Sequence, residues 1–403
     1  MSSQRYKILI LLLLFTINSC KSENQYDQTV DGANVLEEGY TPHPEPERMP
    51  HPDIQAIELD LVDNDSALAD MPENLQLLYH FLNDGNHNKH IQKLDLHVSS
   101  QASFHAASID ENTLIILDQR RNRLIQYSLG EDDFIELAPE GRGPGDILFT
   151  RDLQVFNNRI YIAMQGFRIS IFNCETFPCE YERTISTDFN NYSVSPASNY
   201  VTVLGLYPFG REQDPDPENY NLPAVHIINR EGDVKQSFSS VYRHMQPIIR
   251  EQMNSRGTVI SFPDRRSHFL LYSFFPYIYS YDNQGYLQNK YRLPNFQQGY
   301  YDYNEIERRG RFRHNDNSAI TNATKLNNEW VILQIRNRED MYWNNGLRGK
   351  HWYSYYAFNA DSHELHKIGE DSIYNTGEGR AIYTTEHGLV INEGGTSLYW
   401  IGN

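Results

Sequence analysis

From about residue 110 onward, short apolar runs alternate with short polar turns along the chain. The run Thr113–Leu117 is followed by the polar stretch Asp118–Asn122 and then by a second run, Arg123–Tyr127. A third run, Phe134–Leu137, follows Gly130. Apolar runs of roughly 4–8 residues that are bounded by Gly, Asn and Asp are typical of β-strands. This part of the chain therefore predicts three short strands joined by turns.

The same three-strand unit recurs down the chain. Its further copies are Arg159–Ala163, Arg168–Phe172 and Tyr181–Ile185; Tyr200–Leu204, Ala224–Ile228 and Val234–Phe238; Phe269–Tyr272, Tyr277–Tyr281 and Leu287–Tyr291; and Trp330–Ile335, Trp352–Ala357 and Glu364–Ile368. Repeats of three or four strands at intervals of roughly 40–65 residues are typical of a β-propeller, in which each repeat forms one blade. We therefore predict an all-β, six-bladed β-propeller. A β-sandwich with additional strands is the alternative.

A four-stranded blade needs an inner strand before each triplet. The candidates are Ser103–Ile109, Arg151–Phe156 and Ala319–Leu326. The sixth unit, Gly388–Ile391 and Ser397–Ile401, lacks an outer strand. The alternating segment Ile57–Val62 precedes the first blade, so we predict that this N-terminal strand pairs with Ser397–Ile401 and closes the ring, which would remove an open sheet edge.

One short helix is predicted before the first blade. Asp70 and Glu73 have the spacing of a capping box, and Pro72 suits a first helical turn. The apolar residues that follow recur at helical spacing and share one face; they are Leu75, Leu78, Phe81 and Leu82. We expect this helix to pack on the outside or the rim of the ring.

The first nineteen residues have the pattern of an export signal. Arg5 and Lys7 precede the apolar run Ile8–Ile17, which as a helix would span about 15 Å, half of a ~30 Å hydrocarbon core. Cys20 follows, and this arrangement resembles the lipobox of bacterial lipoproteins, in which the signal is cut and the new N-terminal cysteine is acylated, for example with palmitate. The alternative is an ordinary signal peptide with an incidental cysteine.

Three regions follow from this pattern: residues 1–19 as a lipoprotein signal peptide, 20–53 as a tether and 54–403 as the propeller. The tether is acidic and rich in proline and lacks apolar periodicity, so we predict that it is disordered. Strand alternation would make the tether leave the ring opposite its long insertions. The expected location is a bacterial membrane, the outer membrane in particular, with the propeller facing the periplasm or the exterior.

Net charge bears on the class of binding partner, and the cysteine positions bear on disulfide and metal chemistry. The chain carries 53 acidic and 35 basic residues, a net charge of −18. Nucleic acid is therefore not an expected partner, because its phosphates require a basic face. Cys174 and Cys179 flank a short stretch that contains Pro178. In an exported protein a disulfide is the favoured reading, with free thiols as an alternative; a metal would need further ligands, and none lies nearby in the sequence.

A glycine-rich stretch, Glu140–Asp146, lies between the outer strand of the first blade and the inner strand of the next. On this stretch, residues 113–172 resemble a family of bacterial lipoproteins described only as six-bladed β-propellers, of the NHL or TolB-like kind and without a defined activity; that family usually has Glu where this chain has Asp146. The resemblance implies the fold and the location. The stretch lacks the Lys-Ser/Thr of a phosphate-binding loop, so a tight structural turn is favoured, with Arg142 as a candidate for the central channel.

Long connections mark the candidate binding surface. They are Tyr207–Tyr220, Ser239–Gly257, Pro294–Asn317 and Arg336–His351. Because strands alternate in direction within a blade, second-to-third and blade-to-blade connections emerge on one face, so we expect all four there. Aromatic and arginine side chains suit stacking on sugar rings or peptide side chains and capture of carboxylates. The candidate binding residues are Arg142, Tyr301, Arg308, Arg311, Tyr342, Trp343 and Arg348. The alternative is that they pack the loops together.

Signatures of enzymes are mostly missing from the sequence, including G-x-S-x-G and H-E-x-x-H. Two neighbouring acidic residues such as Asp302 and Glu305 could form the catalytic carboxylate pair of a glycosidase. Such pairs arise easily by chance among 53 acidic residues. We therefore expect a lipid-anchored, monomeric binding or scaffold module for a glycan or a peptide, without cofactor or metal. The alternative function is a propeller hydrolase or lyase acting on sugars or lactones.

Overall fold

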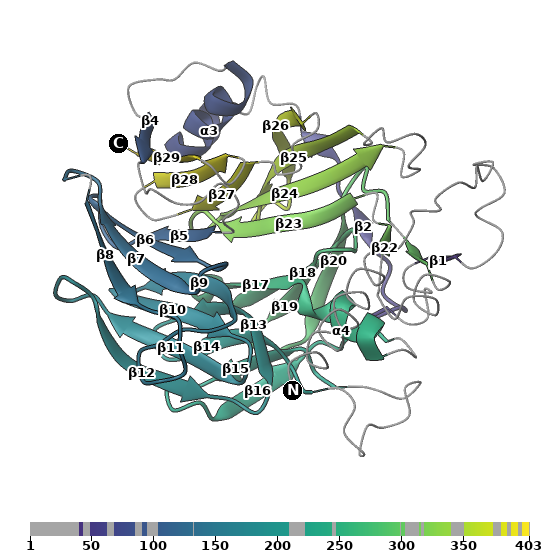
Figure 1. The fold of residues 1–403 in the computed structure, drawn as a ribbon. Helices are drawn as coiled ribbons and strands as arrows, with labels where there is room; N and C mark the ends of the chain where they lie inside the picture. The colour runs from purple at the N-terminus through teal and green to yellow at the C-terminus, as the bar shows by residue number, and fades with distance from the viewer. Residues whose placement is uncertain are drawn as a thin grey trace, which may run out of the picture.

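The computed structural model describes residues 40–42, 49–62, 68–84, 91–94, 104–131, 133–208, 222–243, 247–298, 300–302, 314–315, 318–339, 350–373, 380–384, 388–393 and 397–402. Six antiparallel sheets are arranged around one axis, so the chain is a six-bladed β-propeller (Figure 1). In the described residues, no helix has both the length and the apolar character needed to cross a membrane.

Each blade contains four strands in sequence order from the axis outward, except that the sixth blade takes its outer strand from elsewhere. The first blade contains β5 (Phe104–Ser108), β6 (Thr113–Asp118), β7 (Arg123–Ser128) and β8 (Asp133–Ala138), and the second contains β9 (Thr150–Phe156), β10 (Arg159–Met164), β11 (Arg168–Asn173) and β12 (Glu180–Ser186). The third contains β13 (Asn190–Pro196), β14 (Val201–Leu206), β15 (Val225–Ile228) and β16 (Val234–Phe238), and the fourth contains β17 (Gly257–Phe262), β18 (Ser267–Tyr272), β19 (Tyr277–Asp282) and β20 (Leu287–Arg292). The fifth contains β23 (Ser318–Lys325), β24 (Trp330–Glu339), β25 (Lys350–Asn359) and β26 (Leu365–Ile373), and the sixth contains β27 (Arg380–Thr384), β28 (Gly388–Glu393) and β29 (Ser397–Gly402).

An N-terminal strand closes the ring, but it is not the strand predicted from the sequence. The fourth strand of the sixth blade is β4 (Ile91–Leu94), which pairs antiparallel with β29. Leu94 is buried there against Trp400 and the first-blade residue Phe104. The prediction that Ile57–Val62 pairs with Ser397–Ile401 is therefore wrong. Both segments precede the first blade, and only the tertiary structure shows which one reaches the last blade.

The predicted closing segment instead extends two other blades. Strand β2 (Ile57–Glu58) pairs parallel with β20, and β3 (Leu61–Val62) pairs parallel with β26. Their side chains are largely exposed, with Ile57 at 49% and Leu61 at 40%. The chain before the first blade thus passes the outer edges of the fourth, fifth and sixth blades in turn, and it covers strand edges that would otherwise be open.

The predicted helix is confirmed as α3 (Glu73–Asp84), and it lies outside the ring over the last two blades (Figure 1). Its apolar face packs against Ile368 of β26 and Leu389 of β28. A Cβ atom at Gly369 would lie 2.7 Å from the Leu82 side chain, so the close approach of helix and sheet requires glycine at that position. The 3-10 helices η2 (Leu68–Asp70) and η3 (Pro263–Arg265) are short turns.

The core lies between neighbouring blades, because side chains of successive strand residues point to opposite faces of each sheet. In β5, Phe104 and Ala106 pack toward the sixth blade, with Val390 and Trp400. Ala107 packs toward the second blade, in a cluster with Leu153. A strand such as β5 therefore contributes to two interblade clusters, and the middle strand β6 is buried along its whole length.

Hydrogen bonds between loops establish which connections share a face. Gln165, in a second-to-third connection, donates its N–H to Phe149 in the preceding blade-to-blade connection at 3.0 Å. Ser273 donates in the same way to Arg256 at 2.7 Å. We name the face that carries these two kinds of connection the insertion face. The strand order assigns the predicted insertions 207–220 and 336–351 to the first kind, and 239–257 and 294–317 to the second.

Two of these insertions contain regular structure that the sequence analysis did not predict. Helix α4 (Pro247–Ser255) lies before β17 and places Met253 in the cluster between the third and fourth blades. Strands β21 (Tyr300–Asp302) and β22 (His314–Asn315) pair with each other in the next insertion. Strands β24 and β25 also run farther into their connection than predicted.

Part of the predicted tether is also ordered against the propeller. Strand β1 (Tyr40–Pro42) pairs antiparallel with β21, and the Nε2 atom of His51 lies 3.1 Å from the Tyr281 hydroxyl. The expectation of no secondary structure is therefore wrong for these three strand residues. Because β21 belongs to an insertion, β1 lies beside the insertion face, and the expected departure of the tether from the other face is also wrong.

Candidate functional site

The axis of the propeller is lined by the inner strands of the six blades, which do not pair with one another. Their inward backbone groups therefore need other partners, since a buried peptide group without a hydrogen bond is costly. Side chains from neighbouring blades supply them. These side chains form a closed series of contacts that we call the axial circuit; its members are His105, Asp152, Ser193, Ser195, Asn322, Lys325 and Tyr383.

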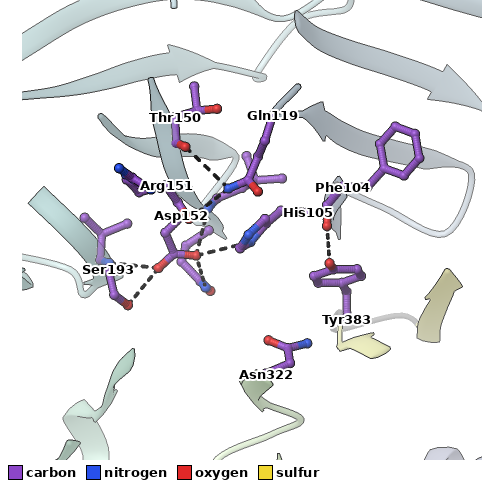
Figure 2. A network of polar contacts seen from close by, with 12 residues as sticks. Phe104, His105, Gln119, Thr150, Arg151, Asp152, Ser193, Asn322 and Tyr383 are labelled. Atoms are coloured by element: carbon purple, nitrogen blue, oxygen red, sulfur yellow. Dashed lines mark hydrogen bonds and ion pairs between the residues drawn. The ribbon is translucent and has the colours of Figure 1, made fainter. Parts of the chain in front are cut away.

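Asp152 of β9 is the centre of the circuit (Figure 2). Its Oδ2 atom accepts hydrogen bonds from the Ser193 hydroxyl at 2.8 Å and from the Val194 N–H at 2.9 Å. Its Oδ1 atom accepts from the Leu153 N–H at 2.8 Å and from the Gln154 amide at 3.3 Å. Hydrogen bonds to an ionised carboxylate are stronger than neutral ones, so Asp152 ties the second blade firmly to the third.

The remaining members link the other blades. Ser193 and Ser195 accept the N–H groups of Val259 and Ser261 in β17, at 3.3 and 2.9 Å. In β23, the Lys325 ammonium donates to the Ser261 carbonyl at 3.4 Å.

Two further contacts complete the path around the axis. The Asn322 amide donates to the Ile382 carbonyl at 2.6 Å. The Tyr383 hydroxyl donates to the Phe104 carbonyl of the first blade. The axial circuit therefore has a structural role, and most of its polar atoms are committed to it.

His105 retains unused hydrogen-bonding capacity. Its Nδ1 atom lies 3.6 Å from Asp152 Oδ1, its ring lies 5.4 Å from the Tyr383 ring between centroids, and its side chain is 24% exposed. Burial lowers the pKa of His105, and the Asp152 carboxylate offsets this only in part, so the imidazole is neutral at pH 7. In the described part of the chain its Nε2 atom has no polar partner.

The circuit does not have the order of a catalytic triad. In a triad the histidine lies between the serine and the aspartate and takes the serine proton. Here Asp152 lies between His105 and Ser193, and the Ser193 hydroxyl donates to the carboxylate (Figure 2). Two other serine–histidine contacts, Ser261–His268 and Ser237–His226, involve histidines that are 1% and 0% exposed.

The insertion face next to the axis carries an exposed aromatic residue in a strained conformation. Phe149 precedes β9 and has a φ of 52°, in the left-handed region that favours glycine, and its side chain is 57% exposed. Its carbonyl is held by the Gln165 N–H. Strained backbone conformations of residues other than glycine tend to cluster at functional sites, because the surrounding structure maintains them at a cost. Phe149 and the adjacent end of the axial circuit form the candidate site.

The glycine-rich stretch forms a closed turn. The Gly143 N–H donates to Asp146 Oδ2 at 2.8 Å, and Gly145 has a φ of 84°. A Cβ atom at Gly141 would lie 2.2 Å from the Asp146 carboxylate, so that carboxylate occupies the space that a phosphate would need. The structural interpretation of this stretch is therefore the better one. Arg142 is exposed on the turn, and its carbonyl accepts from Arg168 Nη1 at 3.3 Å.

The described residues include two of the predicted binding residues, Arg142 and Tyr301. Arg142 lies on the insertion face, at the blade-to-blade connection of the first two blades. The Tyr301 backbone lies in β21, paired with Thr41 and His314. The other predicted binding residues lie outside the described residues; they are Arg308, Arg311, Tyr342, Trp343 and Arg348.

The predicted cysteine pair lies on the other face. Cys174 and Cys179 are joined by a disulfide in the β11–β12 connection, where both are buried. The Cys179 N–H donates to Gln126 Oε1 at 3.0 Å, which fixes the turn to the first blade. Among the described residues, no three His, Cys, Asp or Glu side chains are grouped so that they could hold a metal ion.

Sequence reasoning missed the axial circuit and Phe149. The circuit residues are single polar positions in otherwise apolar inner strands, and they are spread over most of the chain. Phe149 lies in a short connection, whereas the search for binding residues relied on long ones. Its one visible signal was its position just after the glycine-rich turn.

Comparison with known proteins agrees with the fold. No protein-family model and no curated protein sequence matches the chain. Among solved structures, it is similar to a member of the DUF4221 family from Bacteroides vulgatus, with 10% identity over 77% of this chain and 95% of that chain and a TM-score of 0.50. This similarity supports the propeller architecture.

Two further solved structures are similar at lower scores. One is a protein from Bacteroides fragilis described as exported, with 12% identity, coverage of 77% of this chain and 86% of that chain, and a TM-score of 0.44. The other is a streptogramin B lyase, with 10% identity, coverage of 78% and 97%, and a TM-score of 0.44.

Proposed function

We propose that this protein is an exported, lipid-anchored propeller that binds a glycan or a peptide outside the cytoplasm, on the insertion face beside the axis. The observation that supports this most is Phe149, an exposed aromatic side chain held in a left-handed backbone conformation next to the axial circuit. An exposed ring with neighbouring polar groups suits stacking and hydrogen bonding of a ligand.

The state of the axial circuit favours binding over the alternative of a hydrolase or a lyase. The Asp152 carboxylate accepts four hydrogen bonds, so its proton-accepting positions are occupied. The Ser193 hydroxyl is committed to that carboxylate. His105 Nε2 can accept a hydrogen bond from a ligand, which is a binding role.

Replacing Phe149 by glycine separates binding from stability. Glycine removes the ring and adopts the left-handed conformation without strain, so we expect Phe149→Gly to leave the free energy of unfolding within about 1 kcal/mol of the parent. Binding to the ligands found on a glycan and peptide array should fall at least about tenfold, a loss of roughly 1.4 kcal/mol. The measurement uses the full chain in detergent.

Phe134→Ala is the matched control, because Phe134 is 38% exposed but lies on the outer strand β8. This variant should bind every array ligand as the parent does. Equal affinity of Phe149→Gly and the parent would contradict the proposed site. A loss of folding in Phe149→Gly would contradict the interpretation that Phe149 is a strained surface residue.

The lipid anchor is tested separately at Cys20. Acylation of the new N-terminus with two or more chains gives stable membrane attachment, at ~0.8 kcal/mol per buried CH₂ group. We therefore expect Cys20→Ser to move the protein from the membrane fraction to the soluble exported fraction. Fractionation with quantitative immunoblotting measures this. If the variant stays with the membrane, the anchor is not a lipid on Cys20.

A further inference from the structure

The insertion face of the first two blades carries a group of arginines that, among the described residues, have no acidic partners. We name it the arginine patch; its members are Arg121, Arg142, Arg151 and Arg168. The first three side chains are exposed, and Arg168 is half-buried. In the described part of the chain, none of the four forms an ion pair with a carboxylate. The chain as a whole has a net charge of −18, so this surface has the opposite sign of charge.

Three arginines elsewhere on the propeller form ion pairs with carboxylates. Arg159 contacts Glu182 at 2.7 Å, Arg265 contacts Asp361, and Arg292 contacts Glu58 at 3.3 Å. Acidic residues outnumber basic ones by 53 to 35, so a surface arginine in this protein readily finds a carboxylate. Exposed Arg230 and Arg266 also form no ion pair in the described structure, but they lie singly, whereas the arginine patch gathers four such side chains on the connections of two blades.

Contacts between the loops hold the patch together. The Gln119 amide, in the turn that ends near Arg121, donates to the Arg151 carbonyl at 3.0 Å. Arg151 in turn donates to the Gln165 side chain, and its guanidinium lies 5.8 Å from the centre of the Tyr192 ring. The patch therefore spans three connections of the first two blades.

The second and third of these connections also meet through Arg168, which donates from Nη1 to the Arg142 carbonyl at 3.3 Å. Two acidic residues lie in the same loops. The Asp146 carboxylate is turned inward and accepts the Gly143 N–H, and Glu140 is exposed. A third acidic residue, Glu251 of α4, lies near the Tyr192 ring that Arg151 faces. The four arginines therefore outnumber the three neighbouring carboxylates.

We propose that the arginine patch and Phe149 together bind an acidic glycan, an oligosaccharide whose sugar rings carry carboxylate or sulfate groups. This inference rests on the proposed binding function and specifies its ligand. The planar guanidinium group matches a carboxylate or a sulfate with two parallel hydrogen bonds. Phe149 lies two residues before Arg151 in the sequence. Its ring offers a flat apolar surface for the face of a sugar.

The geometry of the surface favours a glycan over an acidic peptide. Peptides commonly bind by adding a strand to an exposed sheet edge, and the patch consists of turns and strand ends. Negative charges that repeat along a stiff sugar chain suit arginines presented by three separate turns. The circuit residue His105 adds an acceptor at the axial side of this surface.

The test compares charged and neutral oligosaccharides on the full chain. The acidic probes are oligogalacturonate and a chondroitin sulfate oligosaccharide, the neutral probe is a malto-oligosaccharide of matched length, and poly-glutamate represents an acidic peptide. Calorimetry should show binding of at least one acidic probe, with an affinity that falls as salt concentration rises. The neutral probe should bind at least about tenfold more weakly.

The decisive variant is Arg121→Ala combined with Arg142→Ala. Neither guanidinium has a partner in the described part of the chain, so the thermal midpoint should not change. Because hydrogen bonds to charged groups contribute more binding free energy than neutral ones, we expect about a tenfold loss of affinity for the acidic probe per arginine removed. The control is Arg183→Ala combined with Arg292→Ala, which removes the same charge from ion-paired positions. It should leave affinity within about twofold of the parent.

Different failures have different meanings. If the double patch variant binds the acidic probe as tightly as the parent, or if both double variants lose affinity equally, the patch is not the binding surface. Preferred binding of the neutral probe would overturn the acidic ligand but keep the proposed glycan-binding function. Preferred binding of poly-glutamate would overturn the glycan assignment. If no probe binds and Phe149→Gly has no effect on any array ligand, the proposed function itself fails.

Discussion

Replacing Leu94 by alanine should lower the free energy of unfolding by about 2–5 kcal/mol. Leu94 is 3% exposed and ends β4, the strand that completes the sixth blade. Its side chain packs where the last blade meets the first, with Trp400 and Phe104. The substitution removes apolar contacts from the interface that holds the ring closed. Urea unfolding followed by circular dichroism measures the change.

The matched control for Leu94 is Leu61→Ala. Leu61 belongs to the segment predicted from the sequence to close the ring, but its side chain is 40% exposed on β3. A half-exposed leucine leaves little cavity when shortened, so we expect a loss below about 1 kcal/mol. If Leu61→Ala is as destabilising as Leu94→Ala, the assignment of β4 as the closing strand is wrong.

The second large effect is acid destabilisation through two buried histidines. Burial lowers the pKa of His226 to about 4, and a hydrogen bond to the Gly205 carbonyl opposes this only in part. Burial also lowers the pKa of His268 to about 4, with partial opposition from Asp282. His226 stacks on Phe189 at 4.0 Å between ring centroids, which leaves no room for the hydration that a charged imidazole needs.

Because the pKa of each histidine is lower in the folded protein than in the unfolded chain, the unfolded chain takes up protons first as the pH falls. The stability that comes from the neutral imidazoles is therefore fully present above about pH 6.5 and is lost as the pH falls toward about 4. A shift of one pKa unit is worth about 1.4 kcal/mol, so each histidine removes roughly 3 kcal/mol over that range.

Urea unfolding at about pH 7, 5.5 and 4.5 measures this loss. His226→Gln keeps a donor for the Gly205 carbonyl but cannot take up a proton, so its stability should fall less steeply over the same range. The Nε2 atom of His226 lies 3.1 Å from that carbonyl, and Nδ1 lies 2.8 Å from Ser237 Oγ. An equal pH dependence in the variant and the parent would show that His226 does not carry this effect.

The axial circuit separates the structural residues of the site from those free to meet a ligand. Asp152, Ser193 and Asn322 replace the backbone pairing that neighbouring inner strands lack. Substitutions there should disturb the ring before they disturb binding. Phe149 and the arginine patch make few such contacts, so they are the better positions for testing function.

The route of the chain before the first blade also bears on the proposed lipid anchor. Strand β1 lies beside β21, so the leading segment reaches the propeller near the insertion face. A lipid on Cys20 would still be separated from β1 by about 20 residues, enough chain to span several tens of Å when extended. Such an anchor would therefore not impose one orientation of the insertion face.

The sequence alone determined the class of fold, because strand and turn signals are local. The predicted strands Thr113–Leu117, Arg123–Tyr127 and Phe134–Leu137 correspond to β6, β7 and β8, and every end agrees within one residue. The helical spacing from Leu75 to Leu82 likewise predicted α3. These patterns depend on which side of one strand or one helix faces the core, and neighbouring residues are enough to specify that.

The tertiary structure decided the relations between segments that are distant in sequence. Ile57–Val62 and Ile91–Leu94 both precede the first blade, and the better alternating pattern of the former made it the wrong choice for the closing strand. The axial circuit arises only when six blades bring single residues of separate strands together, and the arginine patch arises only when the connections of the first two blades meet. Their members carry no common local pattern, because the circuit residues are defined by contacts with other blades and the patch residues by their place on adjoining connections.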